Sequence, residues 1–128
     1  MPLADIEGPQ RKVIWVLVKP TKGLYGELGI PVRDGRTLPF TVTRAWNAPA
    51  GWYPEAWYIV DPETRAVVYE APTVPRLVWG LQSVSEITDR VTEPIELAPG
   101  TYLLVLALGG MNGGEFEIEA FEAAEEAA

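Results

Sequence analysis

The sequence predicts an all-β protein, an antiparallel Greek-key β-sandwich of roughly seven to nine short strands. Two observations carry this prediction. β-Branched and aromatic residues gather in short runs, as they do in strands. The runs are separated by turn-forming residues, with 12 glycines and 12 prolines in 128 residues.

The first half of the chain holds four strand signals. Residues 12–18 (KVIWVLV) end before Pro20, and residues 38–46 alternate so that Phe40, Val42 and Arg44 share one face. Residues 55–61 and 65–70 flank the sequence Asp-Pro-Glu-Thr, which favours a type I turn. These two runs are therefore expected to form a hairpin.

The second half is predicted to contain a loop, a helix and three strands. Residues 71–82 carry two prolines and are read as a traversing loop. Residues 83–91 fit a short helix, because Val84, Ile87 and Val91 recur at helical spacing after a serine cap. Strands are expected at three further ranges: 93–97, 101–108 and 115–121.

Three regions follow from this pattern. Residues 1–11 have no strand signal and are predicted to be an extended N-terminal arm. Residues 12–121 form the predicted β-domain, and residues 122–128 an acidic tail. At this length a single domain is expected.

One turn resembles the tyrosine corner of fibronectin type III and related β-sandwich domains. The resemblance covers Leu97-Ala98-Pro99-Gly100-Thr101-Tyr102, with the spacing to Tyr102 one residue shorter than in the usual form. It implies that the tyrosine hydroxyl hydrogen-bonds back to the chain, and it implies no function.

Composition excludes several kinds of chemistry. The chain has no cysteine and no histidine, which removes disulfides, thiolate zinc sites and the commonest general base. The formal charge is −8 and the basic residues are scattered, so no nucleic-acid partner is expected. No apolar run is long enough to span a membrane, and no membrane partner is expected. We predict no cofactor, no metal ligand and no catalytic residue.

The N-terminal sequence and the overall composition bear on origin. MPLADIEGPQR lacks the basic and apolar segments of a signal peptide, which predicts a protein made in the cytoplasm. Cysteine is absent, asparagine and glutamine are rare, and proline is frequent, a thermophile pattern. A GC-rich genome would give the same bias.

Paired carboxylates are the enzyme chemistry that survives this composition. The candidates are Glu55, Asp61, Glu63, Glu70 and Asp89. None lies in an apolar segment that would raise its pKa. A carboxylate hydrolase therefore ranks behind the other functions.

Three predicted strands are apolar on both faces, although one face of an antiparallel sheet is commonly wet. We predict that Trp15 and Trp57 lie in the core. The second apolar face of each of these strands is expected to be covered by the loop 71–82, by the segment 83–93, or by another subunit. The candidate subunit contacts are Ile14, Val16, Val18, Tyr58, Leu103 and Val105.

A second group of aromatic residues falls in a segment rich in alanine, proline and glycine. Trp46, Trp52 and Tyr53 are expected in a loop, where recognition residues collect. The favoured reading is a loop folded onto the end of the sheet. The alternative is an exposed surface that stacks against a sugar or contacts a partner protein.

These observations favour a non-enzymatic structural protein over an enzyme. The leading hypothesis is an oligomeric subunit of a larger assembly, such as a phage capsid decoration protein or minor virion protein, by analogy of architecture alone. The alternative is a carbohydrate-binding or adhesive module that uses exposed tryptophan and tyrosine rings.

Overall fold

The computed structural model describes residues 11–22 and 27–124. Within them the chain forms strands and no helix, which confirms the predicted all-β class. The strands are β1 (Lys12–Pro20), β2 (Ile30–Arg33), β3 (Arg36–Thr37), β4 (Phe40–Asn47), β5 (Gly51–Val60), β6 (Val67–Glu70), β7 (Val74–Val78), β8 (Ser85–Val91), β9 (Gly100–Leu108) and β10 (Met111–Glu122).

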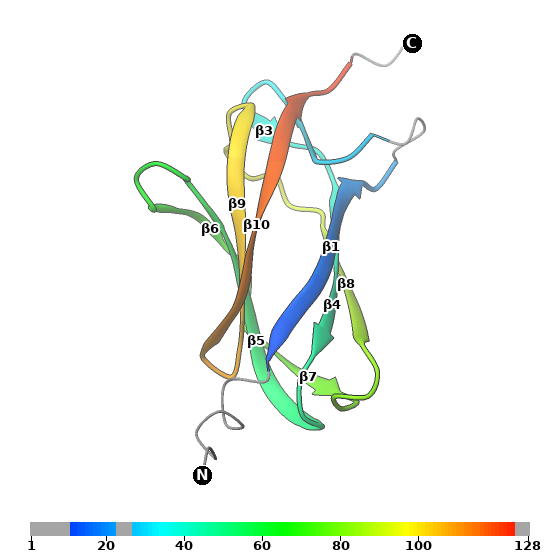
Figure 1. Ribbon diagram of the computed structural model, residues 1–128. Helices are drawn as coiled ribbons and strands as arrows, with labels where there is room; N and C mark the ends of the chain where they lie inside the picture. Colours follow the sequence, from blue (N-terminus) through cyan, green and yellow to red (C-terminus); the bar gives the residue numbers. More distant parts are fainter. Residues whose placement is uncertain (1–10, 23–26, 125–128) are drawn as a thin grey trace.

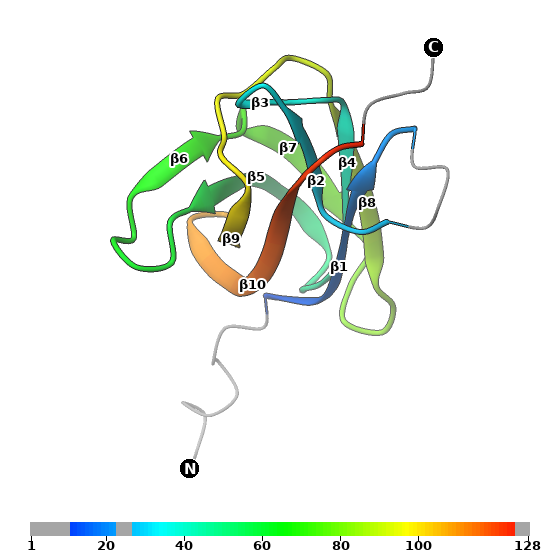
Figure 2. The ribbon, with the colours of Figure 1, turned by 90° about the horizontal axis from the view of Figure 1, so that it is seen from above.

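The strands make two sheets that face each other (Figure 1). The small sheet has the order β1-β4-β8, and the large sheet has the order β3-β2-β10-β9-β5-β6, with β7 also paired to β5. Every pairing is antiparallel except that of β2 with β10. The large sheet curls, as Figure 2 shows from above. The Greek-key arrangement of a sandwich stays a prediction.

The core lies between the two sheets. The large sheet contributes Trp57 and Ile59 of β5 and Leu106 of β9 to the core. The small sheet contributes Phe40 and Trp46 of β4. All five side chains are almost completely buried. Each such side chain contributes roughly 1.5–3 kcal/mol through burial. The core position predicted for Trp57 is therefore confirmed.

The helix predicted at residues 83–91 is wrong, because this segment is the strand β8. Ser85 and Val91 are buried, and Ile87 and Asp89 are partly buried between exposed neighbours, which is the two-residue period of a strand. The sequence does not show this alternation clearly, because the inward-facing position 89 holds an aspartate where an apolar residue is expected. The loop predicted over residues 71–82 likewise contains β7.

The core position predicted for Trp15 is also wrong. The pairing of β1 with β4 is irregular between Val13 and Trp15, with Val13 opposite Trp46 and Trp15 opposite Ala45. The intervening residue, Ile14, forms a β-bulge, which exchanges the inward and outward faces for the residues of β1 that follow it. Val16 and Val18 therefore face the core, while Trp15 is 38% exposed.

The predicted tyrosine corner is present. The Tyr102 hydroxyl donates a hydrogen bond to the carbonyl oxygen of Ala98 at 2.8 Å. The bond ties the start of β9 to the segment that precedes it. The resemblance of residues 97–102 to this feature is thus confirmed at the level of its hydrogen bond.

The chain ends fall partly outside the described residues. Of the predicted arm 1–11 only Arg11 is described, and it donates to the Leu108 carbonyl at 3.0 Å. β10 continues through Glu122, and residues 125–128 of the predicted tail lie outside the described part.

Candidate functional site

A buried network of charged side chains joins the two sheets. Its centre is Arg44 of β4 and Glu55 of β5, both almost completely buried. The Arg44 Nε donates to Glu55 Oε2 at 2.7 Å, and its Nη2 donates to Oε1. The Trp46 indole N–H donates to Oε2 of the same carboxylate at 2.7 Å. The strands β4 and β5 are therefore linked by charge-assisted hydrogen bonds in the middle of an apolar core.

The network continues to the edge of each sheet through Arg76 of β7 and Asp89 of β8. The Arg76 Nη2 donates to Asp89 Oδ1 at 2.6 Å, and its Nε donates to Glu55 Oε1 at 3.1 Å. The Trp57 indole N–H donates to Asp89 Oδ2 at 3.0 Å, and Arg44 reaches the same oxygen at 3.1 Å. The positive charges of two guanidinium groups thus balance the negative charges of two carboxylates.

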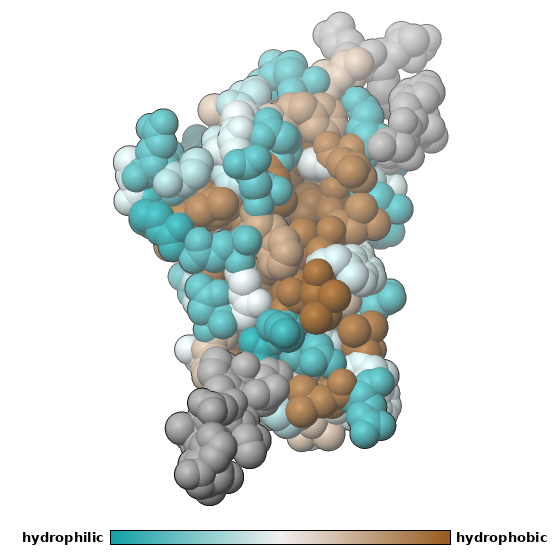
Figure 3. Space-filling view, viewed as in Figure 1, coloured by the Kyte–Doolittle hydropathy of each residue, from teal (hydrophilic) through white to brown (hydrophobic). Residues whose placement is uncertain are grey.

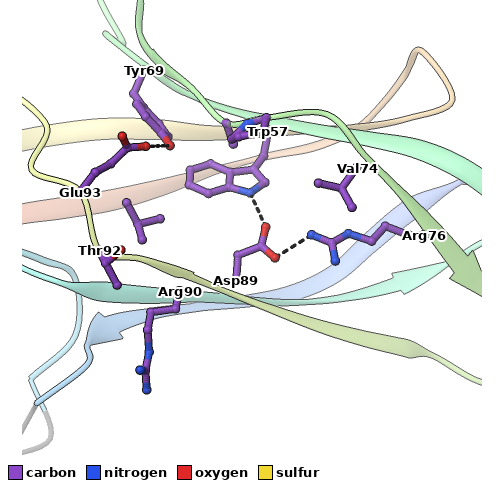
Figure 4. A pocket seen from close by; sticks show the side chains of 11 residues that line it. Trp57, Tyr69, Val74, Arg76, Asp89, Arg90, Thr92 and Glu93 are labelled. Atoms are coloured by element: carbon purple, nitrogen blue, oxygen red, sulfur yellow. Dashed lines mark hydrogen bonds and ion pairs between the residues drawn. The ribbon is translucent and has the colours of Figure 1, made fainter.

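A groove of about 380 Å³ opens beside this network, between β8 and the strands β6 and β7 (Figure 4). Trp57, Tyr69 and Val74 line its large-sheet side, and Asp89 lies across from them. The rings of Trp57 and Tyr69 are 5.6 Å apart between centroids and tilted by 52°. The Tyr69 hydroxyl donates to a Glu93 carboxylate oxygen at 3.4 Å. Burial, followed by the charge of Glu93, raises the pKa of Tyr69.

Asp89 is poorly suited to act as a general acid in this groove. Burial alone would raise the pKa of Asp89, but the hydrogen bond from Trp57 and the charges of Arg44 and Arg76 outweigh it and lower that pKa. A general acid needs a raised pKa, so the shift has the wrong direction. Glu55 is enclosed by its partners.

The remaining carboxylate candidates do not converge on the groove. Asp61 lies in the turn after β5, where the backbone N–H groups of Thr64 and Glu63 lower its pKa. Glu63 and Glu70 are exposed. Within the described residues no three acidic side chains gather as a metal site would require, and no helix could span a membrane.

Exposed apolar side chains lie on the outer face of β5 and β7 and in the segment that follows β7, and we call this set the aromatic patch. It consists of Trp52 of β5, Leu77 of β7, and Trp79, Leu81 and Val84 between β7 and β8. Trp52 and Leu77 are paired across the two strands, and Trp52 and Trp79 are each 69% exposed. The surrounding segments 48–54 and 74–84 contain one charged residue, Arg76, which is turned inward to the network.

The three aromatic residues predicted for a recognition loop lie in different environments. Trp46 is completely buried within β4, so it cannot contact a ligand at the surface. Tyr53 is partly buried, its hydroxyl donates to the Pro49 carbonyl at 2.9 Å, and Arg11 lies over its ring. Only Trp52 is widely exposed. The partners of Trp52 in the patch were missed, although Pro75, Leu77 and Trp79 alternate as one strand face.

The six predicted subunit contacts do not form one surface. Val18 is buried in the core and Val16 packs against it, while Ile14 is exposed at the bulge. In Figure 3 apolar side chains gather along β1 and between β1 and β10. Tyr58 and Val105 are paired on the outer face of the large sheet, and Leu103 lies two residues from Val105 on the same face. Those three residues are partly buried.

Comparison with known proteins shows the fold and no family. No protein-family model matches, and a search of curated proteins gives no match. Among solved structures, the chain is similar to the alkylpurine DNA glycosylase AlkC of Pseudomonas fluorescens, bound to DNA with an abasic-site analog. The identity is 16% and the TM-score 0.53, over 93% of this chain and 32% of the glycosylase. A β-glucosidase of Listeria innocua matches at 15% identity and a TM-score of 0.43, over 83% of this chain and 16% of that enzyme.

These comparisons correct two expectations. The structure that matches at a TM-score above 0.5 is a DNA glycosylase and not a virion protein, which overturns the hypothesis of a particle-coat subunit. The expectation that nucleic acid is excluded as a partner is overturned by the DNA-bound glycosylase. At these identities the likeness concerns the fold alone, and the chain spans about a third of the glycosylase it matches.

Proposed function

We propose that this protein is a non-catalytic recognition domain, built as a Greek-key β-sandwich, that binds a partner protein through the aromatic patch. The observation that carries the proposal is the exposure of Trp52 and Trp79, each 69% exposed, in two segments whose one charged residue is Arg76. Exposed apolar patches mark interaction sites, and tryptophan is among the residues that contribute most to protein interfaces.

The charge distribution favours a protein surface as the partner of this patch. The chain has a net charge of −8, yet the segments 48–54 and 74–84 carry one charged side chain, Arg76, which is paired with Asp89. A nucleic-acid backbone would require basic side chains there. The paired prolines Pro54 and Pro75 lack amide N–H groups, so recognition at this face depends on side chains.

Site-specific photo-crosslinking in cells that express the protein tests the proposal. A photoreactive residue placed at Leu77, in the middle of the patch, is expected to capture protein. Trp52→Ala and Trp79→Ala, introduced together, should remove that adduct. Because both rings are exposed, these substitutions should change the free energy of unfolding by only about 0.5 kcal/mol or less.

The control is the same photoreactive residue at Val67, which is exposed on β6 away from the patch. Equal capture at Leu77 and Val67, or an adduct at Leu77 that survives loss of both tryptophans, would contradict the proposal. A nucleic-acid adduct at Leu77 would contradict it as well.

The second candidate is contact with DNA through the outer face of the small sheet. Two observations favour it: the DNA-bound structure that shares the fold, and the row Lys19, Thr41 and Arg90 across β1, β4 and β8, which has a basic residue at each end. Trp15 lies on the same face of β1 as Lys19. If this candidate holds, fluorescently labelled single-stranded DNA binds, and Lys19→Glu with Arg90→Glu abolishes binding that Trp52→Ala leaves intact.

A further inference from the structure

The outer edge of β8 is a place where another strand can pair. β8 has one neighbour, β4, in the described part of the chain. The opposite edge of β8 therefore offers the N–H and C=O groups of Ser85–Val91 that do not pair with β4. An extended segment added to this edge would become the fourth strand of the small sheet.

The groove beside this edge supplies a surface for the side chains of such a segment. Alternate side chains of an added strand would point toward Tyr69, Val74 and Arg76 on the large sheet. The volume of about 380 Å³ exceeds what one aliphatic side chain fills, and it is in the range of small ligand sites. Figure 4 shows this space between the ribbons, with the ring of Tyr69 on one side.

The charged network holds the groove in shape before anything binds. Arg76 and Trp57 of the large sheet both donate to Asp89 of β8, at 2.6 and 3.0 Å. These bonds fix the separation of the two sheets at the groove floor. A preformed groove lowers the entropy lost on binding.

The large-sheet side of the groove cannot serve as the pairing edge. β6 ends at Glu70 and β7 begins at Val74, so the edge is interrupted. Within β7, Pro75 has no amide hydrogen to donate. Strand pairing is therefore directed to β8.

Charges on the outer face of β8 set the chemistry of the segment. Glu86, Thr88 and Arg90 are exposed at alternate positions. Neither Glu86 nor Arg90 has an ion-pair partner among residues 11–22 and 27–124. An antiparallel neighbour would match them with an acidic residue beside Arg90 and a basic residue beside Glu86, because opposite charges across strands are favourable.

We propose that β8 binds an extended segment of another protein by strand addition, with aliphatic side chains alternating into the groove and an acidic, then a small polar, then a basic side chain facing outward. This surface is separate from the aromatic patch and goes beyond the function proposed above.

A second copy of this chain is the main alternative occupant. Its β8 carries the same Glu–Thr–Arg pattern and could match the charges in antiparallel pairing. However, Asp89 of that copy would be held in its own network, and its Val91 is buried in its own core. A second β8 would therefore leave the groove unfilled, which is why a free segment is favoured.

A synthetic peptide containing VEITVKV is the probe, with binding followed by fluorescence anisotropy. The expected result is saturable binding that is lost when one alternating set of peptide amides is N-methylated and kept when the other set is methylated. Only pairing along one strand edge gives this alternation. The protein is unchanged in this comparison, so its folding does not enter.

A charge exchange in the protein gives the matched test. Glu86→Arg combined with Arg90→Glu should weaken binding of VEITVKV on the order of tenfold and strengthen binding of VKITVEV. Binding insensitive to methylation of either set would overturn the proposal, as would no binding at about millimolar peptide. Light scattering completes the test: a dimer that Glu86→Arg dissociates would assign this edge to a second copy instead.

Discussion

Glu55 accepts four hydrogen bonds within the core, from two nitrogens of Arg44 and one each of Arg76 and Trp46. A buried carboxylate is tolerated only when donors replace the water it has lost. Arg44 and Arg76 also donate to Asp89, whereas the Trp46 indole N–H donates to Glu55. This residue therefore decides whether the charges of the core are balanced.

Glu55→Gln should destabilise the protein by about 3–5 kcal/mol. The substitution keeps the shape of the side chain but leaves Arg44 and Arg76 with one carboxylate between them. The free energy of unfolding in urea measures the effect. The exposed pair of Arg65 and Glu115 provides the control, since Glu115→Gln should leave the unfolding midpoint almost unchanged. Equal effects of the two substitutions would show that burial of the network is unimportant.

Asp89 should make stability depend on pH in the acid range. Its pKa is lowered in the folded protein relative to the ordinary value of 3.8, because the bond from Trp57 and the two arginines outweigh burial. The folded state therefore binds this proton less readily than the unfolded state. The stabilisation is fully present above about pH 4 and is lost as pH falls through the lowered pKa.

The measurement is the free energy of unfolding of wild type and Asp89→Asn between about pH 6 and pH 2. The difference between the two proteins should shrink as pH falls, since protonated Asp89 and asparagine are both uncharged. Other carboxylates titrate in both proteins, so only the difference is informative. Parallel curves over the whole range would refute this role of Asp89.

At the scale of the elements, β10 packs closely against the small sheet at Gly113, where a side chain would not fit. A Cβ added to Gly113 would clash with two ring carbons of Trp46, which is completely buried. The pairing of β10 with β9 is irregular at this point, between Asn112 and Gly114. The bulge brings the backbone of β10 against the indole.

Gly113→Ala should therefore destabilise the protein by about 1–3 kcal/mol through overpacking. Thermal or urea unfolding measures the loss. In a double variant with Trp46→Phe, the loss caused by Gly113→Ala should be smaller, because the ring atoms nearest the added methyl are removed. Additive losses would mean that the strain arises elsewhere.

Most strands were predicted from sequence, but the strand expected at 93–97 is wrong, because this segment forms only an isolated bridge between Glu96 and Arg36. The faces of the strands were predicted less well. Runs such as 12–18 and 101–108 form strands because β-branched and large apolar residues pack on a pleated surface. The bulge after Val13 could not be predicted from alternation, so Trp15 was assigned to the wrong face. Asp89 concealed the strand β8 because its partners Arg76 and Trp57 are distant in sequence.

The candidate site was predicted only in parts. Arg44 was placed on the same face as Phe40 and Val42, and Glu55 and Asp89 were named as carboxylates of interest. An arginine on an apolar face is a signal for a buried ion pair, but the pattern does not name its partner. The groove depends on how two sheets meet, which a single sequence does not specify.

For the molecule as a whole, the net charge of −8 weakens the folded state through repulsion between exposed carboxylates. The outward row Glu115, Glu117 and Glu119 on β10 is one concentrated source. The buried network, in contrast, is neutral and shielded from ions in solution. Added salt should weaken the repulsion between exposed carboxylates far more than it weakens the ion pairs of the buried network.

Raising sodium chloride from about 10 mM to 150 mM should therefore raise the Tm, because the screening length falls from about 30 Å to about 8 Å. Differential scanning calorimetry measures the change. Glu117→Lys with Glu119→Lys should reduce the dependence on salt. A Tm that falls with salt would show that exposed ion pairs outweigh the repulsion.

The bulge at Ile14 bears on how the domain can change in length during evolution. Loss of the single codon for Ile14 would convert β1 into a regular strand, with Val13 and Val16 still facing the core. Loss of any one residue between Trp15 and Val18 would instead turn half of the strand inside out. Relatives of this domain that are one residue shorter in β1 should therefore be aligned with the gap at Ile14.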